Sequence, residues 1–168
     1  MNKRLFCRLL LAAVAALGIV LDQLTKHLAV RYLMPLDTYP IWKNVLHLTY
    51  VENRGAAFGM LADNRWIFMV ISTVAILALL IWFYFLAKAY RYLSTTAIAL
   101  IVSGGIGNMI DRLALGYVVD FIDLRLIRFA VFNVADSLVC IGAALLALAE
   151  VIDASADKKR PRSGESAS

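Results

Sequence analysis

Six ionisable side chains lie in or beside the long apolar runs of this chain, where charged groups are rare. They are Asp22, Lys26, Asp111, Arg112, Asp120 and Asp136. A charge at the centre of a lipid-facing helix costs about 2.5–3.5 kcal/mol, so such groups usually face other protein segments and pair with one another. These residues therefore indicate a functional site, and the acids among them favour carboxylate chemistry.

Asp120 and Asp136 are the two acids best placed to act together. Asp136 lies seven residues into the last apolar run, about 10 Å along a helix, which is shallow rather than central. Asp120 precedes that run on the same side. Two carboxylates about 3 Å apart cannot both ionise. The ionised one can deprotonate a water that attacks an amide carbonyl, while the protonated one polarises that carbonyl and later assists the leaving amine. The two apparent pKa values would belong to the pair.

Both acids also have structural interpretations. Asp120 can be a solvated loop acid, and Asp136 can be a hydrogen-bond partner that holds two spans together. Asn133 lies three residues before Asp136, on the same helical face, and can bond a group held by that acid. Ser137 has no neighbouring base in the sequence, which disfavours serine catalysis.

The other four charges favour structural interpretations more strongly. Asp22 and Lys26 are spaced i, i+4, which predicts an ion pair at a helix end rather than catalysis. Asp111 and Arg112 can anchor a helix at the membrane surface, although Arg112 can equally meet a lipid phosphate or a substrate carbonyl. Neither histidine of the chain has a partner at metal-ligand spacing, so we expect no metal site.

The elements that position these residues are predicted from composition and from the apolar runs. Of the 168 residues, 62% are hydrophobic and 17% charged, and the mean hydropathy is +0.76. Soluble domains are about 45–50% apolar and about 25% charged, so a bilayer is the expected solvent. We predict a single membrane domain, all-α with a small β portion. It comprises spans at about 9–27, 67–87, 93–112 and 131–150, an extracytoplasmic segment with short strands at 28–66, and a disordered tail at 153–168.

The net charge of +5 is distributed in a way that predicts the orientation. Basic residues flank the runs at three places, namely Lys3, Arg4 and Arg8, then Lys88 and Arg91, then Lys158, Lys159, Arg160 and Arg162. Such clusters mark cytoplasmic loops. Both termini and the 88–92 loop are therefore expected in the cytoplasm, with the acids near the opposite face. No basic face interleaved with aromatic residues suggests a nucleic-acid partner.

Five short motifs, in this order, resemble the signature segments of the bacterial lipoprotein signal peptidases over about residues 5 to 150. They are Leu21-Asp22-Gln23-Leu24-Thr25-Lys26, Asn53-Arg54-Gly55-Ala56-Ala57-Phe58, Gly107-Asn108-Met109-Ile110-Asp111-Arg112, Val118-Val119-Asp120-Phe121 and Phe132-Asn133-Val134-Ala135-Asp136-Ser137. Each motif alone is weak evidence. Their common order on a chain with four apolar spans makes the resemblance specific.

The resemblance implies a monomeric aspartyl endopeptidase of the bacterial inner membrane. It would cut diacylglyceryl-modified prolipoproteins just before the lipid-bearing cysteine, with membrane lipids around it and no metal or organic cofactor. Asp120 and Asp136 would be the catalytic pair, and the 26–66 segment would form a cradle and lid. The residues that shape the site or hold substrate would be Asp22, Lys26, Asn53, Gly55, Asn108, Arg112 and Asn133.

Two other classes of function also use acids in a small membrane protein. A proton-coupled transporter would place an acid near mid-bilayer and often contain repeated halves, whereas here the acids gather on one side and no repeat is visible. A non-catalytic membrane assembly factor would tolerate Asn at positions 120 and 136.

Overall fold

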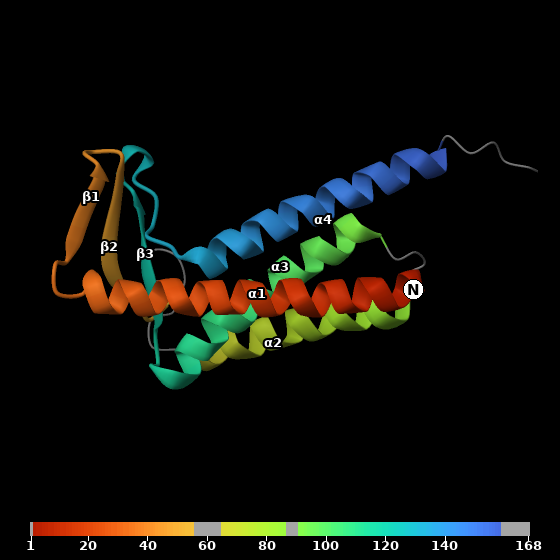
Figure 1. Ribbon diagram of the computed structural model, residues 1–168, viewed down its shortest axis with the longest axis horizontal. Coiled ribbons are helices and arrows are strands. Elements are labelled where there is room, and N and C mark those ends of the chain that lie inside the picture. Colours follow the sequence, from red (N-terminus) through yellow and green to blue (C-terminus); the bar gives the residue numbers. More distant parts are fainter. Residues whose placement is uncertain (1, 56–64, 87–90, 159–168) are drawn as a thin grey trace, which may run out of the picture.

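The computed structural model describes residues 2–55, 65–86 and 91–158. Within these ranges, four helices are long and apolar enough to cross a membrane. They are α1 (Lys3–Tyr32), α2 (Arg65–Ile81, continued by the π-helical turn η2, Trp82–Leu86), α3 (Tyr92–Ala114) and α4 (Val134–Lys158). The helices form an elongated bundle with a small sheet at one end (Figure 1). The predicted fold class, an all-α membrane protein with a small β portion, is confirmed.

Helix α3 is the central helix of the bundle. It packs against α1, α2 and α4. Half of the residues in its most apolar 18-residue stretch are buried, whereas in α2 the corresponding share is 6%. Small residues permit this packing. A Cβ added at Gly104 would collide with the backbone carbonyl of Ala135 on α4, and one added at Gly107 would collide with the carboxylate of Asp22 on α1. These two glycines therefore let the ends of α1 and α4 that carry acids approach α3.

The sheet has three antiparallel strands in the order β1-β2-β3. Strands β1 (Thr38–Trp42) and β2 (Leu46–Asn53) lie in the segment where short strands were predicted. Strand β3 (Val118–Leu124) was predicted as part of a loop, and that prediction is wrong. Its first four residues are all buried, so the strand lacks the alternation of polar and apolar residues that reveals a half-exposed strand.

The start of α1 and the end of α4 lie at the end of the bundle opposite the sheet (Figure 1). Helix α4 continues to Lys158, so the prediction of a disordered tail from Asp153 is wrong for residues 153–158. An ion pair between Arg91 and Asp153 holds this last part of α4 against the start of α3. The remainder of the predicted tail, part of the predicted lid (56–64) and most of the predicted 88–92 loop lie outside the described residues.

Candidate active site

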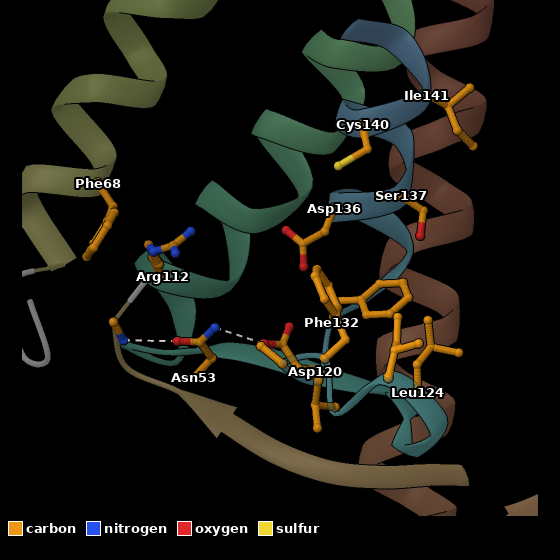
Figure 2. A pocket seen from close by; sticks show the side chains of 15 residues that line it. Asn53, Phe68, Arg112, Asp120, Leu124, Phe132, Asp136, Ser137, Cys140 and Ile141 are labelled. Atoms are coloured by element: carbon orange, nitrogen blue, oxygen red, sulfur yellow. Dashed lines mark hydrogen bonds between the residues drawn. The ribbon is translucent and has the colours of Figure 1, made fainter. Parts of the chain in front are cut away.

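Asp120 is a buried residue of β3, and only 1% of it is exposed. Its Oδ2 accepts a hydrogen bond of 2.8 Å from Asn53 Nδ2, at the end of the neighbouring strand β2. Its Oδ1 accepts one of 2.6 Å from Asn133 Nδ2; Figure 2 shows the bond from Asn53. The interpretation of Asp120 as a solvated loop acid is therefore wrong. A buried carboxylate with both oxygens held by amide donors has a fixed direction in the structure.

Asp136 lies in the first turn of α4, where Asn133 caps the helix. Asn133 Oδ1 accepts a hydrogen bond of 2.9 Å from the backbone N–H of Asp136, and Asp136 Oδ2 accepts one of 3.2 Å from the backbone N–H of Asn133. This reciprocal pair is a capping box, which satisfies two N–H groups that the helix itself cannot. The positive end of the helix dipole also favours a carboxylate here. Asp136 thus completes the capping box through Oδ2, while its Oδ1 accepts a hydrogen bond from Asn108 Nδ2.

Asn108 and Asn133 connect the two acids. Asn133 Nδ2 donates both to Asp120 Oδ1 and, at 3.1 Å, to Asn108 Oδ1. Asn108 Nδ2 in turn donates to Asp136 Oδ1 at 2.8 Å. Strands β2 and β3, helix α3 and the start of α4 each supply one part of this network. The structure therefore brings together two acids and three asparagines that the sequence places up to 83 positions apart, between residues 53 and 136.

Both acids line a cavity of about 680 Å³, whose walls are otherwise mostly apolar. The full lining is Asn53, Gly55, Phe68, Arg112, Asp120, Leu124, Ile127, Phe129, Ala130, Val131, Phe132, Asp136, Ser137, Cys140 and Ile141. The walls come from α2, α3, α4 and the chain that follows β3, and Figure 2 shows the two carboxylates at its polar end. A cavity with an apolar wall and a few convergent polar groups is the usual form of a site for a partly apolar ligand.

Arg112 lies at the side of this cavity rather than only at the end of a helix. Its guanidinium carbon stands 5.1 Å from the centre of the Phe68 ring, and Nη1 donates to the backbone carbonyl of Asn108 at 3.3 Å. Among the described residues it forms no ion pair. The guanidinium can therefore direct further N–H groups at a ligand in the cavity.

A buried cluster of charged side chains on α1 and α3 contacts the hydrogen-bond network of the acids and asparagines. Lys26 Nζ lies 3.0 Å from Asp22 Oδ2, 3.0 Å from Asp111 Oδ2 and 2.8 Å from Asn108 Oδ1. The ion pair predicted between Asp22 and Lys26 is present, and Asp22 Oδ1 also accepts from the backbone N–H of Ala135 at the start of α4. Lys26 thus joins α1 and α3 and, through Asn108, contacts the network that holds Asp136.

Two residues of this cluster have a larger role than the sequence predicted: Gln23 was not predicted as a site residue, and Asp111 was predicted as a helix anchor. Gln23 Nε2 donates to Asp111 Oδ1 at 3.0 Å and to Asp22 Oδ2 at 3.1 Å. Asp111 Oδ2 accepts from the backbone N–H of Val119 at 3.1 Å, which fixes the start of β3 next to Asp120. The signal that could have revealed Gln23 was its position directly after Asp22, at the end of an apolar run.

Burial raises the pKa of Asp120 from its ordinary 3.8 to about 6. The hydrogen bond from Asn53 opposes this shift, the neighbouring charge of Asp136 adds to it, and the Asn133 bond and the Lys26 charge oppose it. A carboxyl whose pKa lies near neutrality, beside a second carboxylate, can hold or release a proton during a reaction.

The raised pKa predicts a pH-dependent contribution of Asp120 to stability. An acid whose pKa is higher in the folded state stabilises that state below pH 4, and this contribution is lost as the pH rises through about 6. The difference in free energy of unfolding between the wild type and Asp120→Asn should therefore shift by roughly 2 to 3 kcal/mol against the wild type between pH 4 and pH 7. Denaturant unfolding in a non-ionic detergent at a series of pH values measures it. A difference in free energy of unfolding that stays constant over this pH range would contradict the raised pKa of Asp120.

Comparison with known proteins places the whole arrangement among bacterial membrane enzymes. The family described as Signal peptidase (SPase) II matches residues 14–152. The protein named lipoprotein signal peptidase from Caldanaerobacter subterraneus is 50% identical over 133 residues, covering 79% of this chain and 90% of the relative. That from Clostridioides difficile is 47% identical over 129 residues, covering 76% and 85%.

The fold is also found in solved structures. A structure of a bacterial membrane enzyme, obtained by the in meso method at 2.3 Å resolution, superposes with a TM-score of 0.81 at 32% identity. The superposition covers 89% of this chain and 92% of the other. A second such structure, at 1.9 Å resolution, superposes with a TM-score of 0.74 at 33% identity and covers 83% of this chain and 90% of the other.

Proposed function

This chain belongs to the signal peptidase II family of lipoprotein signal peptidases, and from that premise we propose that Asp120 and Asp136 catalyse its peptidase reaction. The substrate would be a diacylglyceryl-modified prolipoprotein, cut immediately before the lipid-bearing cysteine. The observation that carries the proposal is the convergence of two acids, one fully buried and one in the first turn of α4, on one mostly apolar cavity.

The chemistry needs one proton shared by the two carboxylates. The ionised carboxylate takes a proton from a water molecule while the water oxygen bonds to the scissile carbonyl carbon. The protonated carboxyl donates a hydrogen bond to the carbonyl oxygen as negative charge develops there. Collapse of the tetrahedral intermediate breaks the C–N bond, and a proton from the pair goes to the leaving amine. The raised pKa of Asp120, caused first by burial, supports the sharing of a proton near neutral pH.

The asparagines and Arg112 would position the reacting groups. Asn53, Asn108 and Asn133 each donate to a carboxylate oxygen, so the acids are oriented before substrate enters. Preorganised donors lower the reorganisation that the transition state requires. Arg112, with N–H groups directed toward the cavity, would bond a backbone carbonyl of the substrate. Gly55, which lies buried in the lining, would leave room for the substrate backbone.

The shallow position of the acids supports a substrate that is cut beside its lipid anchor. Asp136 is in the first turn of α4, and Asp120 is on the sheet at the same end of the bundle (Figure 1). The apolar walls of the cavity would accommodate the diacylglyceryl group and the signal peptide. A proton-coupled transporter would place its acids near the middle of the helices, which is not where these acids lie.

The same geometry supports an orientation in the bacterial inner membrane. Lys3, Arg4, Arg8 and Arg91 belong to helix ends opposite the sheet, while the acids lie at the sheet end. With the basic end in the cytoplasm, the active site would open near the extracytoplasmic face.

Cleavage of a lipid-modified substrate by the purified protein in detergent tests the proposal. We expect a diacylglyceryl-modified prolipoprotein to yield a mature product whose mass begins at the modified cysteine. The matched control is the same prolipoprotein with serine in place of that cysteine, which cannot carry the lipid and should remain uncut. Cleavage of both substrates at equal rates, cleavage elsewhere, or no cleavage of a substrate that another family member processes would each overturn the proposal.

A further inference from the structure

A second groove shares no lining residue with the active-site cavity. It has a volume of about 280 Å³ and lies between the last two turns of α1 and the sheet. Its lining is Thr25, Leu28, Ala29, Tyr32, Leu33, Leu48 and Phe121. Thr25 supplies the one aliphatic hydroxyl among these, and it bonds to the backbone carbonyls of Leu21 and Asp22. The groove therefore presents an almost wholly apolar surface.

The groove continues a stripe of exposed apolar residues along α1. The stripe residues are Leu17, Leu21, Leu24, Leu28 and Tyr32, each between 43% and 69% exposed. Their spacing of three or four positions puts them on one face of the helix. An apolar helix face of this kind, in a multi-pass membrane protein, is in contact with lipid chains. The floor of the groove is formed by buried residues of the small core under the sheet, Ala29, Leu33 and Phe121.

A cation stands at the end of the stripe near the sheet. The guanidinium carbon of Arg31 lies 5.4 Å from the centre of the Tyr32 ring, which itself lines the groove. Among the described residues, Arg31 forms no ion pair. Arginine binds phosphate well because its N–H groups match the phosphate oxygens. Half of a hydrocarbon core, about 15 Å, corresponds to about ten residues of helix, the distance from Arg31 back to Leu21.

We propose that this groove binds one phospholipid with an anionic headgroup. The phosphate lies on Arg31, and one acyl chain fills the groove beside Tyr32 and follows the α1 stripe toward Leu21. Arg31 has no ion pair within residues 2–55, 65–86 and 91–158, and this cation beside an apolar groove of the right length favours a lipid with net negative charge. A zwitterionic lipid fits the channel equally well but presents its own cation beside the arginine.

Native mass spectrometry of the full chain, released from detergent with either phosphatidylglycerol or phosphatidylcholine, tests the proposal. We expect one retained phosphatidylglycerol, bound more tightly than phosphatidylcholine. Arg31→Gln should weaken phosphatidylglycerol binding about fivefold and phosphatidylcholine binding by a smaller factor, because the choline cation already offsets part of the attraction between Arg31 and the phosphate. Lys43→Gln is the matched control, because it removes an exposed cation in the β1–β2 turn at the same end of the molecule, and it should change neither lipid.

A variant that fills the groove distinguishes the contribution of the acyl chain to binding from that of the headgroup. Thr25→Trp should weaken the binding of both lipids at least tenfold, with Leu28→Asn as a second variant should the tryptophan prevent folding. Equal effects of Arg31→Gln and Lys43→Gln would mean that anionic lipid is attracted non-specifically to cations at the sheet end, and would overturn the proposal. Unchanged lipid retention in a folded groove variant would overturn it as well.

Discussion

Asp136→Asn is expected to reduce cleavage of a diacylglyceryl-modified prolipoprotein by at least about 10³-fold while leaving the protein folded. Asparagine has the size and shape of aspartate, and its oxygen can still accept from Asn108 or from the helix N-terminus. It cannot take a proton from water, so the step that creates the nucleophile is lost. Initial cleavage rates in detergent, with the melting temperature measured on the same sample, separate loss of chemistry from loss of fold.

Asp120→Asn should have a similar effect, and the double variant should be no slower than either single one. Residues that act as a unit in one step show this non-additivity, because removal of one already abolishes the joint function. Asp123→Asn is the matched control, since it makes the same change three residues further along β3. Asp123 bonds Thr49 and Arg125 and does not line the cavity, so its variant should retain activity within about threefold. Normal cleavage by the Asp120 and Asp136 variants would mean a non-aspartic mechanism or a non-catalytic role.

The acids could be singled out from the sequence because placing a charge in a membrane costs free energy. Asp22, Asp120 and Asp136 stand out in or beside apolar runs, where a charge without a partner is selected against. The i, i+4 spacing of Asp22 and Lys26 predicted their ion pair from local geometry alone, and the structure contains it. A residue pair can be predicted from the sequence when both partners belong to one helix, and a single residue can be predicted when the cost of burying its charge is large.

The resemblance named Asn53, Asn108 and Asn133 as site residues, but which atoms they bond could not be predicted, because these bonds depend on contacts between distant segments. Asn53 reaches Asp120 across 67 positions, through the pairing of β2 with β3. That pairing was hidden, because β3 is buried at its start and shows no alternation of polar and apolar residues. The role of Gln23 likewise depends on α3 lying beside α1, where its amide contacts Asp111 across 88 positions. Register between elements is a tertiary property that local patterns do not contain.

Asn133 shows how local and tertiary requirements can meet in one residue. Its distance of three positions from Asp136 was interpreted as a shared helical face, whereas the structure places it before the helix as a cap. The spacing is the one that a capping box requires, so the same pattern had two physical meanings. The cap fixes where α4 begins, and that fixes the position of Asp136 relative to Asp120.

Lys26→Met is expected to destabilise the protein by about 3–5 kcal/mol, the second large effect that the structure predicts. The lysine side chain is 4% exposed, and the carboxylates of Asp22 and Asp111 that it contacts are 0% and 5% exposed. Methionine keeps the length of the side chain but leaves two buried carboxylates close together without a cation. Breaking a buried ion pair by removing one partner is costly because the remaining charge stays desolvated. Denaturant unfolding in mild detergent measures the loss.

Two further variants distinguish this charge effect from a simple packing defect. Asp22→Asn leaves the lysine with Asp111 and Asn108, so it should cost less than Lys26→Met, about 1–3 kcal/mol. Lys43→Met, at an exposed lysine, should change the free energy of unfolding by less than about 0.5 kcal/mol. A Lys26→Met protein as stable as the wild type, or less affected than Asp22→Asn, would mean that the lysine does not neutralise the buried acids.

Because the same lysine contacts Asn108, which orients Asp136, folded Lys26→Met protein should also cleave more slowly. The buried cation would then serve both the stability of the bundle and the orientation of the acids.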